Sequence, residues 1–181
     1  DPDSKFITMS LRLFEDYLLQ LDFPNSRLCL FDEDSFDLAT LQNITIDSSA
    51  ITGDPVILVE FPDQIEAWLT LSPSYSGAIR VDETLTRFLR LANKDSLNPP
   101  QSEFSSTTID YLTLGPYELG GIIVEYPQQG TRTNLTRNQQ TLTMTNIAKD
   151  RASKGRIGIE ILKHFVITLD MKSERGHIYT P

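Results

Sequence analysis

The residues that could do chemistry are few, and none of them stands in a complete catalytic motif. Ser74 and Ser76 lie in a loop-like stretch after an apolar run, and His164 and His177 are the two histidines. A nucleophilic serine needs a base within hydrogen-bond reach and, in the nucleophile elbow, a glycine on each side. Residues 72–78 (SPSYSGA) lack those flanking glycines, and no motif ties either histidine to a serine. We therefore do not expect a serine hydrolase.

Metal and phosphate chemistry is also poorly supported. Cys29 is the single cysteine, which rules out an intrachain disulfide and a cysteine-based zinc site. The acidic run that begins at Asp32 has Asp37, not glycine, at the sixth position of an EF-hand loop, so a solvated acidic loop is the better interpretation. Gly115 and the Gly120-Gly121 pair have no following Lys-Ser/Thr for a phosphate loop. We expect neither a metal nor a cofactor.

Composition limits the class of protein and its partners. The chain has 181 residues, 39% of them hydrophobic, which is a soluble globular balance. No apolar run approaches the ~20 residues that a membrane span needs. The net charge of −9 argues against nucleic acid as a partner, and the absence of Lys and Arg between Leu28 and Ile79 would favour basic ligands for that stretch. Asn43 and Asn134 begin Asn-X-Thr patterns, and the compartment is left open with a slight preference for an extracytoplasmic or secreted one.

Apolar periodicity and turn residues predict a chain of hairpins with a few short helices. The expected helices are 9–17, 83–91 after an N-cap at Asp82, and a short one ending at Phe165. Residues 93–107 are expected to form a loop or flap. The expected strands are 18–23, 27–31, a short stretch at 44–46, 56–61, 65–71, 78–81, 108–114, 117–126, one within 127–154, 166–170 and a last one ending at Tyr179.

The two ends of the chain resemble each other. Residues 9–31 can be placed on residues 157–179 without a gap, so that the apolar helix face and the following hairpin coincide. The identities are Leu21, Asp22 and Arg27 on Leu169, Asp170 and Arg175. If the later unit ends one repeat, the earlier unit ends another whose beginning is missing. Because Asp1 is no initiator residue, we expect one whole lobe preceded by the tail of a second.

The segment 155–170 resembles the end of a lobe in the retropepsin-like, bacterial-type aspartic protease family. In that family a hydrophobic-hydrophobic-Gly element precedes a short helix and a terminal hairpin; Ile157-Gly158 matches its second half, and Arg156 departs from it. The predicted hairpin 56–71 and the loop after it resemble the opening of such a lobe, where a strand runs into Asp-Thr/Ser-Gly. The resemblance implies a mostly-β, retropepsin-like barrel lobe with two or three short helices.

The resemblance fails at the position of the catalytic acid. The Asp-Thr-Gly position is occupied by Ser72, Pro73 and Ser74. Aspartic proteolysis uses two carboxylates about 3 Å apart that share a proton, and a serine hydroxyl cannot replace one of them. Asp47, followed by two serines, imitates Asp-Ser-Gly and is the second candidate, although a turn-forming aspartate is the ordinary interpretation. The resemblance leaves Tyr75, Ser76 and Gly77 as candidates for contact with a peptide in the groove.

The sequence thus predicts three parts: a helix–hairpin end of a preceding lobe (1–31), an acidic linker (32–54) and an aspartic-protease-like lobe (55–181). The expected function is that of a catalytically degenerate lobe that binds or scaffolds an extended peptide or protein in a two-lobed parent. The missing half would be a separate chain, a second copy or an upstream segment. One alternative is an active aspartic endopeptidase whose acid is Asp47 or is supplied from upstream or by a partner chain. The other is a non-enzymatic β-rich assembly protein.

Overall fold

The computed structural model describes residues 11–14, 16–49, 53–91, 103–128 and 152–181. The strand expected within 127–154 and the Asn134 pattern fall largely or wholly outside these residues. The described part is mostly β, with three short α-helices: α1 (Leu38–Leu41), α2 (Glu83–Phe88) and α4 (Ile159–Leu162). The mostly-β fold with a few short helices expected from the sequence is therefore confirmed. None of the described helices is long and apolar enough to cross a membrane.

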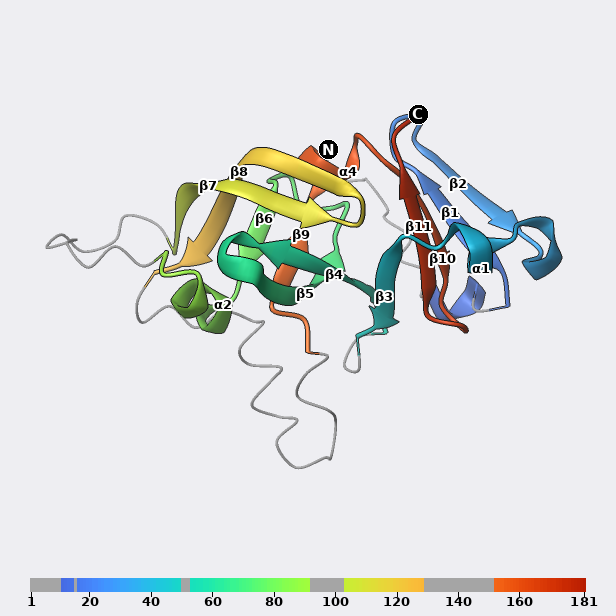
Figure 1. Ribbon diagram of the computed structural model, residues 1–181, viewed down its shortest axis with the longest axis horizontal. Helices are drawn as coiled ribbons and strands as arrows, with labels where there is room; N and C mark the ends of the chain where they lie inside the picture. Colours follow the sequence, from blue (N-terminus) through green and yellow to red (C-terminus); the bar gives the residue numbers. More distant parts are fainter. Residues whose placement is uncertain (1–10, 15, 50–52, 92–102, 129–151) are drawn as a thin grey trace, which may run out of the picture.

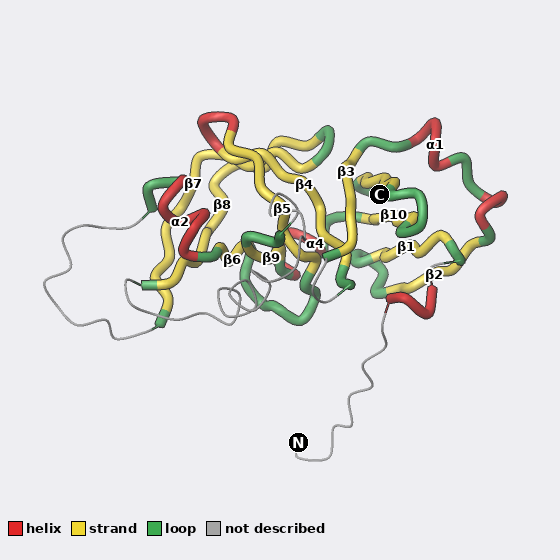
Figure 2. The backbone as a smooth tube through the Cα atoms, turned by 90° about the horizontal axis from the view of Figure 1, so that it is seen from below, coloured by secondary structure: helices red, strands yellow, loops and turns green. Residues whose placement is uncertain are grey.

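Six strands close into a barrel. Their order is β4-β5-β9-β6-β8-β7, and a pairing of Glu60 with Thr113 joins β7 back to β4. The barrel is the left half of the molecule in Figure 1, and Figure 2 shows its strands from below. The strands are β4 (Pro55–Phe61), β5 (Ile65–Leu71), β6 (Ile79–Val81), β7 (Phe104–Leu114), β8 (Tyr117–Pro127) and β9 (Gly155–Ile157).

Alternation of side chains along these strands fills the barrel. Ala67, Leu69 and Leu71 of β5 are buried, while the residues between them lie partly exposed on the other face. The same alternation buries Ile79 and Val81 of β6 and leaves Arg80 on the outer side. The apolar residues of β5 and β6 thus point into the core of the barrel, and the residues between them, Arg80 included, lie on its outer face.

A second sheet packs beside the barrel. Its order is β2 (Arg27–Phe31), β1 (Leu18–Asp22), β10 (Val166–Asp170), β11 (Arg175–Tyr179) and β3 (Ile44–Ser48). It forms the right half of Figure 1. Strand β3 joins the two sheets, since its first residues pair with β11 and its last with β4. The hairpin near the start of the chain and the hairpin at its end therefore lie side by side.

Asn43, just before β3, fastens that strand to β11. Its Nδ2 donates to the carbonyl oxygen of Ile178 at 2.9 Å, and its Oδ1 accepts from the Ile178 amide at 2.8 Å. A sugar on Nδ2 would disturb this reciprocal pair. The structure therefore argues against glycosylation of Asn43 in the folded chain.

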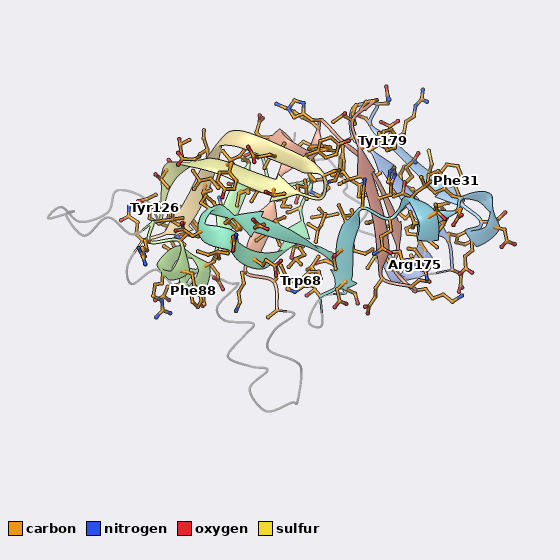
Figure 3. The ribbon with its side chains drawn as sticks, viewed as in Figure 1. Phe31, Trp68, Phe88, Tyr126, Arg175 and Tyr179 are labelled. Carbon is orange, nitrogen blue, oxygen red and sulfur yellow. The ribbon has the colours of Figure 1, made fainter. Side chains whose placement is uncertain are left out.

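Several elements begin or end at other residues than the sequence predicted. In place of the helix expected at 9–17, the described residues hold a single 3-10 turn, η1 (Leu11–Phe14). The helix expected at 83–91 ends earlier, at Phe88 of α2, whose side chain is exposed (Figure 3). Residues 104–107, expected in a loop, begin β7, because they pair with the end of β8 although none of them is buried. The stretch 32–54 contains η2 (Glu33–Ser35), α1 and the whole of β3. A last 3-10 turn, η3 (Pro62–Gln64), links β4 to β5.

The two chain ends have matching local structure at a constant spacing. Gln20 and Thr168, which are 148 residues apart, face each other in the β1–β10 pair, and Gln20 Nε2 donates to Thr168 Oγ1 at 3.1 Å. The same spacing carries η1 onto α4, β1 onto β10 and β2 onto β11, with the same register inside each hairpin. It also carries Ser26 onto Glu174, which both have a positive φ, near 52° and 54°. The four strands therefore have local two-fold symmetry about Gln20 and Thr168.

Candidate functional site

The loop at 72–78 is held between the end of β5 and the start of α4. The Ser72 amide donates to the Ile157 carbonyl oxygen at 2.9 Å, and the Gly158 amide donates to the Ala78 carbonyl oxygen at 2.8 Å. The Ile159 amide donates to the Tyr75 carbonyl oxygen, also at 2.9 Å. The structure thus brings together the two segments that the sequence singled out, the loop and the Ile157-Gly158 element.

Gly158 makes this close approach possible. A Cβ at this position would overlap the carbonyl oxygen of Gly77, and it would lie 2.5 Å from Tyr75 Cδ1 and 2.6 Å from the Tyr75 carbonyl oxygen. The φ of Gly158 is −100°, so the requirement for glycine here is one of space and not of backbone conformation. The loop and the N-terminus of α4 are therefore packed backbone against backbone.

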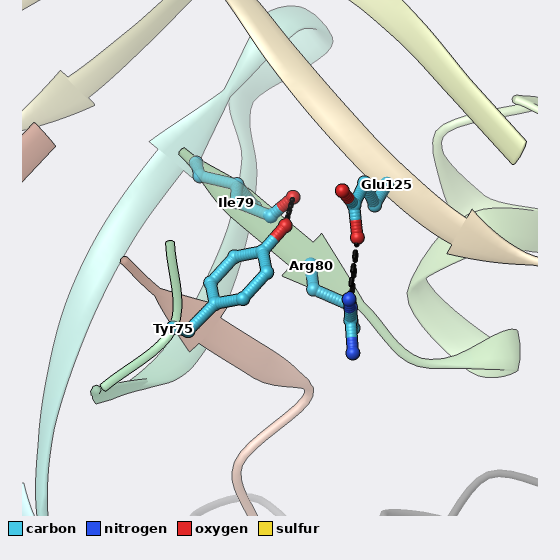
Figure 4. A network of polar contacts seen from close by, with 4 residues as sticks. All are labelled: Tyr75, Ile79, Arg80 and Glu125. Carbon is cyan, nitrogen blue, oxygen red and sulfur yellow. Dashed lines mark hydrogen bonds and ion pairs between the residues drawn. The ribbon is translucent and has the colours of Figure 1, made fainter. Parts of the chain in front are cut away.

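Tyr75 of the loop lies against Arg80 of the following strand, β6 (Figure 4). Tyr75 is buried, and its hydroxyl donates to the Ile79 carbonyl oxygen at 3.4 Å. The Arg80 guanidinium lies 4.7 Å from the Tyr75 ring centroid and 4.2 Å from that of Phe104. Glu125 Oε2 accepts from Arg80 Nε at 3.0 Å and from Nη2 at 2.7 Å. Arg80 is thus held by two aromatic rings and one carboxylate.

The pKa values of this cluster follow from burial and charge. Burial, and then the nearby Glu125 carboxylate, raise the pKa of Tyr75 to about 12. Burial, and then the positive charge of Arg80, lower the pKa of Arg156 below its usual value. The surroundings of Tyr75 therefore favour its neutral phenol.

The raised pKa of Tyr75 predicts a loss of stability at alkaline pH. The unfolded phenol ionises near pH 10 and the folded one near pH 12, so its contribution is complete below pH 10 and is lost as the pH rises toward 12. We expect the urea midpoint of the wild type to fall between pH 9.5 and about 11.5 and that of Tyr75→Phe to fall less. Tyr111→Phe is the matched control. Parallel curves for the wild type and Tyr75→Phe would contradict this assignment.

A pocket of about 430 Å³ opens beside Arg80. Its lining residues, mostly polar, are Arg80, Glu103, Phe104, Ser105, Ser106 and Glu125, from β6, β8 and the start of β7. Ser106, Glu125 and Arg80 are neighbours in register across these three strands. The pocket therefore continues the polar face that begins at the loop.

The loop contains no carboxylate, and Asp47 lies elsewhere. Asp47 is buried in β3, where its Oδ1 accepts from the Ser48 amide at 2.7 Å. It pairs with Val56 of β4, which in turn pairs with Thr70 of β5, so two strand spacings, about 10 Å, separate its backbone from that of β5. The described residues contain no group of three or more His, Cys, Asp or Glu side chains that could hold a metal ion.

The other predicted site residues differ in exposure. Pro73, Ser74 and Ser76 are exposed, Ser72 and Gly77 are half-buried, and Tyr75 is buried. The predicted peptide contacts are therefore open to solvent at Ser76, while the Tyr75 ring packs inside the loop against Arg80. The roles of these residues stay predictions.

Sequence reasoning missed the Arg80–Glu125 pair and its aromatic neighbours. Arg80 and Arg156 each interrupt a short apolar strand, in Ile-Arg-Val and Gly-Arg-Ile, which is a signal for a charged group on an otherwise packed sheet. Nothing in the sequence indicates that Glu125, 45 residues further on, is the partner of Arg80. That pairing depends on the parallel register of β6 and β8.

Comparison with known proteins finds a likeness to a solved structure. No protein-family model and no curated protein matches the chain. Among solved structures, a retropepsin-like aspartic protease from Rickettsia conorii is similar with a TM-score of 0.46 and 12% sequence identity. The match covers 76% of this chain and 92% of that one.

Proposed function

We propose that residues 55–181 form an aspartic-protease-like lobe without a catalytic acid, whose role is to bind an extended peptide or protein segment. The observation that carries the proposal is the loop at 72–78, seated on Ile157-Gly158 by backbone hydrogen bonds and lacking any carboxylate. In the family that the sequence resembles, this loop supplies the acid. Here Ser72, Pro73 and Ser74 occupy its place.

Loss of the acid removes the chemistry but leaves the scaffold. A water placed between two carboxylates is activated because one is ionised and the other is protonated. The hydroxyl of Ser72 neither ionises in the acid to neutral range nor accepts the shared proton. Pro73 also removes a backbone donor from the loop. The barrel, the pocket beside Arg80 and the polar face next to the loop do not depend on the acid, and they support a binding role.

The alternative of an active endopeptidase rests on Asp47 or on an acid from outside the described residues. Asp47 is an unsuitable candidate, since its strand is separated from β5 by β4. The test is cleavage of a protein substrate at acid pH, with pepstatin as the control, in which we expect no pepstatin-sensitive products. The third possibility, a β-rich assembly protein without a peptide groove, would bind none of the peptides in a displayed random library.

We further propose that a second barrel lobe covers the first helix–hairpin unit, residues 11–31. Three exposed apolar residues of this unit have buried equivalents 148 residues later. Leu13 is 67% exposed where Ile161 is 4% exposed, Tyr17 is 43% exposed where Phe165 is 2% exposed, and Leu30 is 42% exposed where Ile178 is fully buried. The second set packs into the barrel of this lobe. An apolar surface of this kind, matched position by position to a buried one, supports an equivalent barrel as its cover.

The covering lobe would not be a second copy of this barrel in the same arrangement. On β11 the position next to β3 is Gly176, where a Cβ would lie only 2.7 Å from Ile44 Cγ1 and Ile46 Cγ2. The equivalent position on β2 is Leu28, which is exposed. An identical β3 could not approach β2 as it approaches β11, because the Leu28 side chain occupies that space. This supports a lobe of different sequence, on the same polypeptide or as a separate chain.

A further inference from the structure

Two arginines stand opposite each other on the barrel, beside the loop at 72–78. Arg80 of β6 and Arg156 of β9 are direct partners in the antiparallel register, so their side chains leave the sheet on the same face. Like charges in this arrangement destabilise a sheet unless other groups compensate them. The groups that neutralise each arginine therefore have to be identified, because an arginine without a neutralising partner is a candidate for binding an anion.

Arg80 is fully engaged. It has the Glu125 carboxylate at 2.7 Å, the Tyr75 ring centroid at 4.7 Å and the Phe104 ring centroid at 4.2 Å. Its side chain is about one-quarter exposed, and that of Glu125 is 31% exposed, so the pair is partly shielded from water. The charge of Arg80 is thus balanced locally by one carboxylate.

Arg156 has no such balance. Within the described part of the chain its side chain has no ion pair or hydrogen bond, although it is only partly exposed. Its other register neighbour is Thr70, whose hydroxyl donates to Ser153 Oγ at 2.8 Å and carries no negative charge. Burial and the charge of Arg80 both act against its positive charge, and its lowered pKa reflects this. A guanidinium with five donors is therefore held without an anion beside the loop at 72–78.

We propose that Arg156, supported by Arg80, binds a carboxylate of an extended peptide that lies along the loop at 72–78. The two arginines and Glu125 carry a net charge of +1, which a single carboxylate neutralises, and the planar guanidinium matches a carboxylate with two parallel hydrogen bonds. The inference rests on the proposed peptide-binding function and deepens it. It reverses, at this one position, the preference for basic ligands that the acidic stretch before Ile79 would suggest.

The experiment is selection of a displayed library of random ten-residue peptides on the wild-type chain and on Arg156→Gln. We expect peptides enriched on the wild type to carry Asp or Glu at one position. On Arg156→Gln that enrichment is expected to disappear. Arg87→Gln is the matched control, because Arg87 lies exposed on α2 and pairs with Glu83 at 3.9 Å, away from the loop; it should enrich the same peptides as the wild type.

One enriched peptide is then measured with its acidic residue and with the amide in its place. We expect the acidic form to bind the wild type about tenfold or more tightly than the amide form, and Arg156→Gln to bind both alike. Acetate at constant ionic strength should displace the peptide at least as well as inorganic phosphate. Displacement by phosphate at far lower concentrations would overturn the assignment to a carboxylate.

Failure of the carboxylate inference can be distinguished from failure of the proposed peptide-binding function. Enriched peptides without an acidic position, or equal binding of the acidic and amide forms to the wild type, would overturn this inference and leave the peptide-binding function standing. No enrichment of any peptide would overturn both. Arg156→Gln also has a readout without peptide: its urea midpoint should equal or exceed that of the wild type, since a compensated structural arginine would instead lower it.

Discussion

Replacement of Gly158 by alanine is expected to destabilise the barrel by about 2–4 kcal/mol. The added Cβ would overlap the Gly77 carbonyl oxygen and press against Tyr75, and both belong to the loop that faces α4. Neither is the flexible end of a long side chain that could turn away at little cost. The loop and the start of α4 must therefore separate, which weakens the hydrogen bonds from Gly158 and Ile159 to the loop. Urea unfolding of Gly158→Ala against the wild type gives the difference.

Gly120→Ala is the control for this prediction. Gly120 lies in β8, where the nearest atom to an added Cβ is the Asp110 carbonyl oxygen at 3.7 Å, an ordinary contact. We expect its effect on the free energy of unfolding to stay within about 0.5 kcal/mol. If Gly158→Ala were as mild as Gly120→Ala, the close packing of the loop on α4 would be wrong. The candidate site would then lose its main structural support.

Truncation of Ile178 and of its equivalent Leu30 is expected to give very different results. Ile178→Ala removes a fully buried side chain from the contact between β11 and the barrel, and should cost about 2–4 kcal/mol. Leu30→Ala removes a side chain that is 42% exposed, and should cost less than about 1 kcal/mol in this chain alone. Both residues lie at the same position of a hairpin with the same register. The difference between the two variants therefore measures how much packing against the barrel contributes to the free energy of unfolding.

The same pair of variants reports on the covering lobe. With that lobe present, the cost of Leu30→Ala should rise toward that of Ile178→Ala. We expect the present chain to sediment as a monomer at micromolar concentration, because Leu28 prevents a second copy from docking as the barrel docks on β11. A dimer that Leu30→Glu disperses would identify a second copy as the cover and contradict the argument from Leu28.

Much of the framework was accessible from the sequence because it depends on local patterns. The hairpins at 18–31 and 56–71 combine apolar strands with clear turn residues, and Asp82 caps α2 as predicted, accepting from the Leu85 amide at 2.7 Å. The spacing of 148 residues follows from the order of apolar positions, and the two hairpins at that spacing have the same register. These features need no information about distant contacts.

The features that were missed depend on distant contacts. Residues 104–107 look like a loop because they are mostly polar, yet they extend β7 by pairing with the end of β8. The cluster of Arg80, Glu125 and Phe104 joins residues from three strands, and only the parallel pairing of β6 with β8 brings them together. A charged residue in a short apolar strand, such as Arg80, indicates that a partner is present, but the sequence does not indicate which residue that partner is.

Proteolysis at acid pH tests most directly the proposal that this lobe has the scaffold of an aspartic protease half without its acid. The chain is incubated with a denatured protein between pH 3 and pH 6, with and without pepstatin, and new N-termini are counted by mass spectrometry. Asp47→Asn is measured in parallel. The account predicts no pepstatin-sensitive cleavage and no difference between the two proteins. Pepstatin-sensitive cleavage that disappears in Asp47→Asn would contradict it and would make Asp47 the catalytic residue.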